Sequence, residues 1–283
     1  MARRPLVVRS VPALRKIVSR YRAKGETVAL VPTMGALHDG HLSLVRAARK
    51  RGKRVIVSIF VNPAQFAPSE DFASYPRNFE ADVRVLNELA VDLVWAPAAA
   101  VMYPPGFVSR IVPEGPATAE LEDKFRPHFF SGVATVVAKL LIQCTPDFAM
   151  FGEKDYQQLK VVTRLVKDLD LPVKIVPVAT VREPDGLALS SRNSYLSASE
   201  RAAASTLYRV LKECADKIAR GEFLTRVIDA GTVAIERAGF ALDYLEARHA
   251  DTLEPVSSVK DGPIRLLVAA RIGKTRLIDN IAA

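Results

Sequence analysis

Two histidines around one glycine, in the stretch PTMGALHDGH (residues 32–41), are a promising group for chemistry in this chain. His38 and His41 are three positions apart, so the first turn of a helix places both rings on one side. Gly40 lets a phosphate or a planar base come close to the backbone. Because a helix N-terminus offers free N–H groups and partial positive charge, the stretch predicts a phosphate site. The same field disfavours imidazolium until a polyphosphate binds.

Two other interpretations of the histidine pair stay open. A metal pair is one of them, but two histidines without a third nearby ligand make a poor zinc site, and we expect no metal ligands. Simple capping of the helix start is the other. If the phosphate interpretation holds, His38 and His41 donate hydrogen bonds to a phosphate in a transition state.

Three more polar clusters follow apolar segments: NPAQF (62–66), GEKD (152–155) and LALSSRN (187–193). Lys154 is a point charge suited to phosphate, and Asp155 is suited either to a ribose or to capping the next helix. An ordinary capped helix with an exposed lysine explains GEKD about equally well. The hydroxyls of Ser190 and Ser191 and the planar fork of Arg192 suit a polyphosphate.

Short apolar runs that alternate with helical periodicity must position these clusters. The runs predict strands over 27–33, 54–62, 91–96, 147–152 and 173–178, and helices over 42–51, 79–89, 133–144 and 155–169. The strands lack polar alternation, which is typical of parallel strands covered on both faces. The pattern therefore predicts an α/β fold with a doubly wound, Rossmann-like parallel sheet. Ligands of such sheets bind beyond the carboxyl ends of the strands, where all four clusters fall.

The pattern changes after Glu183. A long helix is expected over 197–221, with Ser197 or Ser199 as its N-cap, and another over 223–239. The segment LDYLEARHA (242–250) and a hairpin that turns near Gly273 complete this part. We therefore predict two domains: residues 1–183 bind the substrates, and residues 184–283 form a smaller α+β domain that acts as a lid.

Composition limits the classes of function. The chain has 283 residues and a net charge of +9, and residues 1–54 hold 14 Lys and Arg against Glu26 and Asp39. A nucleic-acid-binding module is a rival interpretation, but only Tyr21 interleaves with these charges, and nucleic acid is not an expected partner.

The longest apolar stretch, 132–144, is interrupted by Lys139, so no membrane span or signal peptide is predicted. Two distant cysteines fit a reducing, cytoplasmic location.

The four motifs PTMGALHDGH, FVNPAQF, FGEKDYQQL and DGLALSSRN, in this order, closely resemble the pantoate–β-alanine ligase family, and TRLIDN extends the likeness to the C-terminus. The resemblance implies a two-step ligation. Pantoate attacks ATP to give pantoyl adenylate and pyrophosphate, and β-alanine then displaces AMP to give pantothenate. The H-x-G-H element is shared with the wider nucleotidyltransferase superfamily, so another adenylate-forming enzyme is the nearest rival.

The resemblance also implies roles for matching residues. The ATP site is expected to comprise Met34, Gly35, Ala36, Leu37, His38, Asp39, Gly40, His41, Gly152, Glu153, Lys154, Asp155, Val181, Leu189, Ser190, Ser191 and Arg192. Catalysis is assigned to His41 as proton donor, His38, Lys154, Ser190, Ser191 and Arg192. Gln65, Gln158 and Asn62 are expected to hold pantoate, and Gln65 also to border the β-alanine site. ATP with Mg²⁺ and a homodimer formed by the first domain are implied as well.

Two positions depart from the family pattern. Leu189 replaces the usual methionine before SSR, which is a conservative apolar change. In RPHFFSGV (126–133), Phe129 stands where the family has histidine, and His128 lies one place earlier. His128 is therefore not included among the expected site residues.

Overall fold

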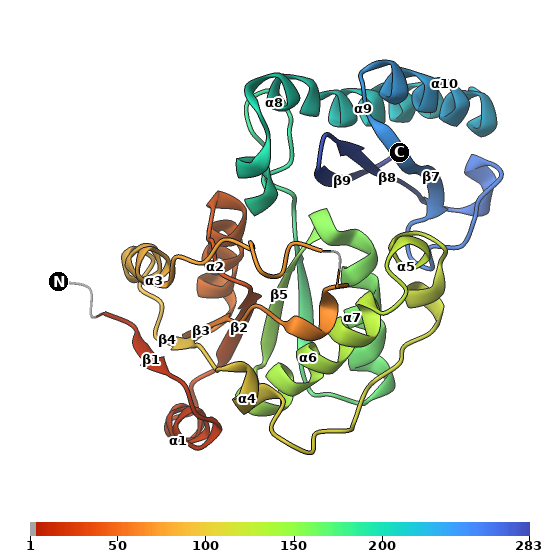
Figure 1. The fold of residues 1–283 in the computed structure, drawn as a ribbon. Coiled ribbons are helices and arrows are strands. Elements are labelled where there is room, and N and C mark those ends of the chain that lie inside the picture. Colours follow the sequence, from red (N-terminus) through yellow and green to blue (C-terminus); the bar gives the residue numbers. More distant parts are fainter. Residues whose placement is uncertain (1–3, 69) are drawn as a thin grey trace.

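The computed structural model describes residues 4–68 and 70–283; residues 1–3 and Ser69, which fall in the first predicted domain, lie outside it. Six parallel strands form the larger sheet in the order β1-β4-β3-β2-β5-β6 (Figure 1). These strands are β1 Leu6–Val8, β2 Val28–Thr33, β3 Arg54–Ile59, β4 Leu93–Trp95, β5 Phe148–Gly152 and β6 Lys174–Val178. The predicted doubly wound sheet is confirmed.

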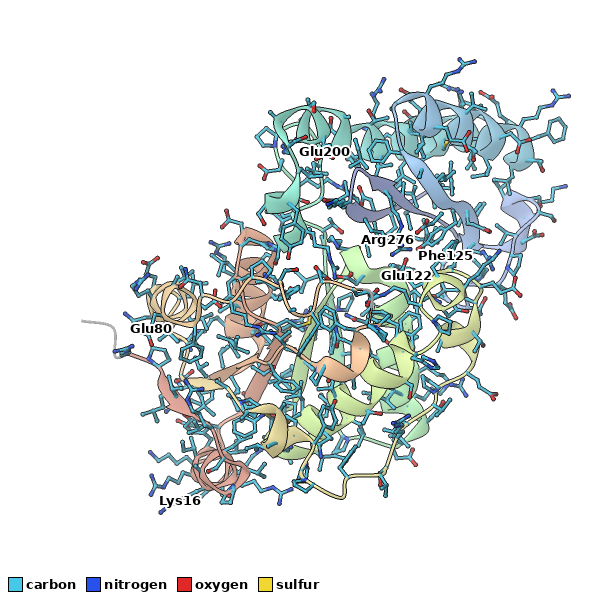
Figure 2. All side chains as sticks on the ribbon, viewed as in Figure 1. Lys16, Glu80, Glu122, Phe125, Glu200 and Arg276 are labelled. Atoms are coloured by element: carbon cyan, nitrogen blue, oxygen red, sulfur yellow. The ribbon has the colours of Figure 1, made fainter. Side chains whose placement is uncertain are left out.

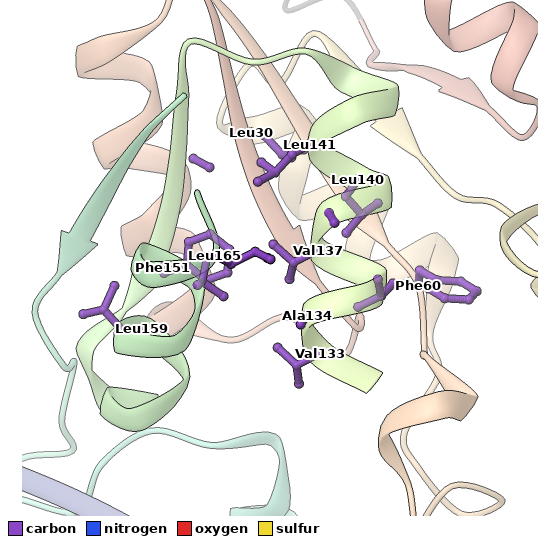
Figure 3. Packing of buried hydrophobic residues seen from close by; sticks show 14 of the residues in the cluster. Leu30, Phe60, Val133, Ala134, Val137, Leu140, Leu141, Phe151, Leu159 and Leu165 are labelled. Atoms are coloured by element: carbon purple, nitrogen blue, oxygen red, sulfur yellow. The ribbon is translucent and has the colours of Figure 1, made fainter. Parts of the chain in front are cut away.

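Helices cover both faces of this sheet: α1 Val11–Arg22, α2 Asp39–Arg51, α3 Phe79–Glu88, α4 Ala99–Met102, α5 Glu122–Phe125, α6 Phe129–Cys144 and α7 Tyr156–Asp168. Leu30 of β2 belongs to the core formed with α1, α6 and α7, whereas Ala29 and Val31 belong to the core formed with α2 and α3. Figure 3 shows α6 carrying Val133 and Val137 in the first core. Strands buried on both faces need apolar residues at every position, which explains their continuous apolar runs.

The smaller sheet is antiparallel and comprises β7 Ala241–His249, β8 Ile264–Ile272 and β9 Thr275–Ala282. The predicted hairpin with its turn at Gly273 is confirmed. Three helices accompany this sheet: α8 Ala198–Ala204, α9 Thr206–Ala219 and α10 Leu224–Arg237. Ser197 caps α8 together with Glu200 in a capping box, as one of the two predicted N-caps.

Three predicted helices differ from those in the structure, and two elements were not predicted. The helix expected over 197–221 is divided at Ser205, whose hydroxyl donates back to the carbonyl of Ala202 and competes with the helical pattern. Helix α2 begins at Asp39 instead of residue 42, because His38 caps it. Helix α6 begins at Phe129 instead of residue 133, and β1 and α1 were not predicted. A three-residue edge strand such as β1 depends on its pairing with β4 rather than on local sequence.

Ionic and hydrogen-bonding contacts join the smaller sheet to the larger one. Arg276 of β9 donates from both Nη atoms to Glu122 of α5, and these two residues face each other at the junction in Figure 2. Arg182 pairs with Asp279 of β9 over 2.6 Å. Within residues 4–68 and 70–283, no helix combines the length and the apolar character needed to cross a membrane.

Candidate active site

A cavity of about 680 Å³ opens at the carboxyl ends of the larger sheet's strands, facing the smaller sheet. Loops from all four sequence motifs contribute to its wall. The predicted site residues that line it are Met34, His38, Gly40, His41, Asn62, Gln65, Gly152, Lys154, Asp155, Gln158, Val181, Leu189, Ser190, Ser191 and Arg192. Gly35, Ala36, Leu37, Asp39 and Glu153 are not among the lining residues.

His38 and His41 cap helix α2 with their own rings. Nδ1 of His38 accepts a hydrogen bond from the Gly40 N–H over 3.2 Å, and Nδ1 of His41 accepts from the His38 N–H over 3.4 Å. The ring centroids are 4.1 Å apart. Because each Nδ1 is an acceptor, each neutral ring carries its proton on Nε2. The two rings therefore do cap the helix. The same hydrogen bonds fix the tautomer of each ring and leave its Nε2–H free to donate.

Both imidazoles are neutral at physiological pH in the ligand-free protein. Burial, followed by the positive charge of Lys154, lowers the pKa of His38 to about 4. Burial, His38 and Lys154 together lower the pKa of His41 to about 3. This direction matches the expectation that the site disfavours imidazolium. A neutral His41 acts as a hydrogen-bond donor rather than as a strong acid.

Lys154 lies at the end of β5, in the short 3-10 turn Glu153–Asp155. Its Nζ is 3.6 Å from Oδ1 of Asp155, and only 20% of its side chain is exposed. Asp155 precedes α7 without a side-chain capping bond, so the capping alternative for this residue was wrong. Glu153 pairs instead with Arg265 of β8, 3.4 Å away. Lys154 therefore brings a positive charge into the cavity wall, while Glu153 helps to join the two sheets.

The serine-rich segment contacts the histidine-bearing loop directly. Ser191 Oγ donates to the Ala36 carbonyl over 3.2 Å, and Ser190 Oγ accepts from the Arg192 N–H over 3.3 Å. The Arg192 guanidinium pairs with Asp71. A neighbouring pair, Arg126 with Glu70, lies on the same cavity wall. Sequence reasoning missed these carboxylates, because nothing in the local sequence shows that residues 70–71 meet arginines from two distant segments.

Gln65 and Asn62 form one connected group of amides. Asn62 is 1% exposed and donates from Nδ2 to Gln65 Oε1 over 3.1 Å and to the Gly132 carbonyl over 3.2 Å. Tyr103 donates to Asn62 Oδ1 over 2.7 Å. Gln65 Nε2 is then left on the Met34 side, 3.2 Å from its sulfur. Asn62 is thus placed to orient Gln65, which presents a donor to the cavity.

The structure shows where Phe129 and His128, which depart from the family pattern, lie relative to the cavity. Phe129 lines the cavity, and the Arg126 guanidinium lies 3.7 Å from its ring centroid. His128 precedes α6 and is not among the cavity-lining residues. Within the described part of the chain, no three His, Cys, Asp or Glu side chains gather as a metal-binding group.

Comparisons with known proteins agree along the whole chain. The model of the family described as pantoate–β-alanine ligase matches residues 6–282. The pantothenate synthetase of Rhodopseudomonas palustris is 63% identical over 282 residues and covers 100% of both chains. That of Nitrobacter winogradskyi is 64% identical over 277 residues, covering 98% of each.

Solved structures extend the agreement to the fold. The pantothenate synthetase of Thermus thermophilus is 48% identical and has a TM-score of 0.92, with 98% of each chain covered. The pantoate–β-alanine ligase of Francisella tularensis, solved with β-γ ATP and β-alanine, is 35% identical and has a TM-score of 0.83, covering 98% of this chain and 97% of that one. The likeness in sequence and in structure thus covers 98% of this chain or more. The chain belongs to the pantoate–β-alanine ligase family.

Proposed function

We propose that this protein condenses pantoate and β-alanine into pantothenate at the expense of ATP, through a pantoyl-adenylate intermediate. The observation that carries the proposal is that histidine, lysine and glutamine donors from separate loops line one cavity, with His41, Lys154 and Gln65 among them. That set of groups suits an anionic acid beside a polyphosphate. Family membership narrows the reaction to the pantoate–β-alanine ligase activity.

In the first step, a pantoate carboxylate oxygen attacks the α-phosphorus of ATP. The bond from the α-phosphorus to the bridging oxygen breaks, and pyrophosphate leaves with the electron pair. The carboxylate is already ionised at neutral pH, so the step needs no general base. The difficulty lies in bringing two anions together and in stabilising the charge that develops on phosphate oxygens.

Neutral imidazole donors and a partly buried ammonium group meet that difficulty. His38 and His41 present Nε2–H groups, and the Lys154 ammonium supplies positive charge between the histidine loop and β5. Ser190, Ser191 and Arg192 line the same cavity. In this proposal the remaining ATP contacts are those given by the sequence motifs, with Val181 and Leu189 packing on the nucleotide.

Pantoate is proposed to lie against the amides. Gln65 presents Nε2 to the cavity and Gln158 of α7 lines the same wall, so both can hydrogen-bond hydroxyl and carboxylate oxygens without adding charge. In the second step, the β-alanine amine attacks the acyl carbon next to Gln65. The bond to the adenylate oxygen breaks, AMP leaves with the electron pair, and the amine loses a proton to solvent.

The nucleotide is expected to carry Mg²⁺, and the donor chemistry of the cavity fits this ion. Asp155 lines the cavity with 47% of its side chain exposed, and it is the carboxylate that would hold the ion with the phosphates and water. Bound Mg²⁺ would neutralise part of the phosphate charge. Lys154, beside Asp155, supplies the protein's own share of that neutralisation.

Residues 184–283 are proposed to act as a lid that keeps water from the adenylate. Contacts from β9 to Glu122 and to the Glu153–Asp155 turn join this part to the cavity wall, and Arg182 pairs with Asp279 beside the proposed boundary at residue 183.

We also propose a homodimer formed through residues 1–183 and a cytoplasmic location, both from the family resemblance. Sedimentation equilibrium tests the dimer.

The proposed reaction is tested with purified protein, ATP, Mg²⁺, pantoate and β-alanine. AMP and pantothenate are expected in equal amounts, and pyrophosphate exchange into ATP is expected with pantoate alone. Exchange that needs no pantoate, or that prefers another carboxylic acid, would favour a different adenylate-forming activity. Omitting β-alanine separates the two half-reactions, since only the second requires it.

A further inference from the structure

Asp82 is a buried carboxylate that faces the histidine-bearing loop from another element. It lies in the first turn of α3 and is 4% exposed. Its Oδ2 accepts a hydrogen bond from the Ala36 N–H over 3.0 Å, and its Oδ1 accepts from the Leu37 N–H over 2.9 Å. Both carboxylate oxygens therefore bind successive backbone N–H groups, 45 residues or more from Asp82 in sequence.

The turn that Asp82 holds has an unfavourable backbone. Gly35 has a φ of +86° and Ala36 a φ of +49°. The left-handed region is ordinary for glycine but costs alanine roughly 1 kcal/mol. Thr33 Oγ1 also accepts from the Gly35 N–H over 3.3 Å. Three successive N–H groups are thus anchored by side-chain oxygens, and this compensates for the strained backbone.

The position of this turn affects both the histidine rings that follow it and the serine-rich segment that contacts it. His38 follows directly and caps α2, so the direction of the turn decides where the two imidazole rings stand. The Ala36 carbonyl accepts the hydroxyl of Ser191 from the serine-rich segment. Ala36 therefore binds Asp82 through its N–H and Ser191 through its carbonyl. A shift of the backbone here would move donors of two cavity-lining segments together.

A carboxylate is the side chain that suits this position. Among the described residues, the hydrogen bonds to the Asp82 carboxylate come from the backbone N–H groups of Ala36 and Leu37. Burial raises the pKa of the Asp82 carboxyl above its ordinary value, while the two N–H groups oppose that rise. A Cβ at Gly35 would stand 3.0 Å from Asp82 Oδ2 and 3.2 Å from Ile59, so a side chain there would press on both neighbours. The absence of a side chain at Gly35 therefore lets the Asp82 carboxylate approach the turn closely.

We propose that Asp82 is a positioning residue for adenylate formation: it holds the Gly35–Leu37 turn so that His38, His41 and Ser191 converge on the nucleotide. The inference rests on the proposed function and adds a residue that does not line the cavity. Because it acts through the ATP-binding loop, Asp82 affects the first half-reaction and leaves the attack of β-alanine on a preformed adenylate unchanged.

The test is the Asp82→Asn variant, which keeps the shape but replaces one acceptor oxygen by a donor that faces an N–H group. We expect pantoate-dependent pyrophosphate exchange to fall about 10²-fold, the size of effect that a 1 Å misplacement produces. The rate with β-alanine and supplied pantoyl adenylate is expected to stay within about twofold of wild type. Equal losses in both half-reactions, or wild-type exchange, would overturn the proposal.

A second readout does not depend on turnover. In ¹⁵N-labelled protein without ligand, the ring nitrogens of His38 and His41 report the Nε2–H tautomer and the acceptor role of Nδ1. Asp82→Asn is expected to shift both sets of resonances, and unchanged resonances would contradict the positioning role. If wild-type protein shows no pantoate-dependent pyrophosphate exchange and forms no AMP with pantoate and β-alanine, the proposed function fails, yet these resonances still test Asp82.

The matched control is Glu80→Gln, on the same helix and two residues away. Glu80 pairs with Arg4 at the surface, with 67% of its side chain exposed, and it lies at the outer edge of the molecule in Figure 2. It should keep wild-type exchange and wild-type histidine resonances. If Asp82→Asn does not fold, Thr33→Val removes another anchor of the same turn and is judged by the same two readouts.

Discussion

Arg192 and Asp71 form a two-pronged ion pair across the cavity wall, with Nη2 2.8 Å from Oδ1 and Nε 3.0 Å from Oδ2. Asp71 lies in the segment between β3 and α3, and Arg192 lies 121 residues later. The guanidinium lowers the pKa of the Asp71 carboxyl, which is therefore ionised at neutral pH. Before the nucleotide binds, the arginine proposed for the phosphates is thus held by an internal anion.

Asp71→Asn removes this competing charge and should lower the KM for ATP about three- to tenfold, which corresponds to roughly 1 kcal/mol. Initial rates of pyrophosphate exchange at varied ATP measure the change. Asp185→Asn is the matched control, because Asp185 pairs with Arg201 and does not line the cavity. A higher KM for ATP in Asp71→Asn would show that Asp71 itself supports nucleotide binding.

His41→Ala removes a preorganised Nε2–H donor. Pantoate-dependent exchange should fall about 10²- to 10³-fold, the usual cost of losing a donor to a developing oxyanion. Because the pKa values of His38 and His41 are about 4 and 3, these residues should add no acidic limb near pH 6.5 to kcat/KM for ATP. Exchange measured between pH 5 and 8 decides this. A limb at pH 6.5 that disappears in His41→Ala would contradict the neutral-donor assignment.

The same pKa values predict how stability depends on pH. An unfolded histidine titrates at about 6.5, so below that pH the unfolded chain binds protons that folded His38 and His41 refuse. Their contribution is fully present above pH 6.5 and is lost as the pH falls toward 4 and then 3. Urea unfolding at pH 7 and pH 5 measures the loss. The double variant His38→Gln/His41→Gln should show a smaller decrease, and an equal decrease would rule out these two rings as its cause.

Gln65→Ala removes the donor proposed for pantoate while leaving the nucleotide loop in place. The KM for pantoate should rise about 10- to 100-fold, as expected for one hydrogen bond to a charged group. The KM for ATP serves as the internal control and should stay within about twofold. An unchanged KM for pantoate together with a raised KM for ATP would show that Gln65 binds the nucleotide and not pantoate.

Asn280 of β9 donates from Nδ2 to the carbonyl oxygens of Glu153 and Lys154, over 3.0 and 2.8 Å, and is 2% exposed. Asn280→Ala leaves both carbonyls without this donor and should lower the free energy of unfolding by about 1–3 kcal/mol. Asn280→Asp should cost more, since it sets a carboxylate against two carbonyls. Denaturant titration measures both variants, and an Asp variant as stable as the Ala variant would contradict this interpretation of the contact.

Much of the fold could be predicted from local pattern. Continuous apolar runs predicted β2, β3 and β5, because strands buried on both faces need apolar side chains throughout. A similar run predicted β6, although this edge strand buries only Val176. The turn at Gly273 and the N-cap at Ser197 were predicted because their chemistry is local. Strand β1 was missed, since its three residues are held by pairing with β4 rather than by their own propensity.

In the candidate site too, the local sequence predicted some features and tertiary contacts decided the others. The sequence by itself determined the chemical groups, such as the histidines beside Gly40 and the lysine after β5, because motif residues follow strand ends and strand ends share an edge. Only the tertiary structure decided which groups are engaged by others. Asp71 holds Arg192, Asp82 holds the turn at Ala36, and Asn280 holds the Lys154 loop. These partners are 46 to 126 residues apart, and no local pattern encodes a hydrogen bond that forms only when distant segments pack together.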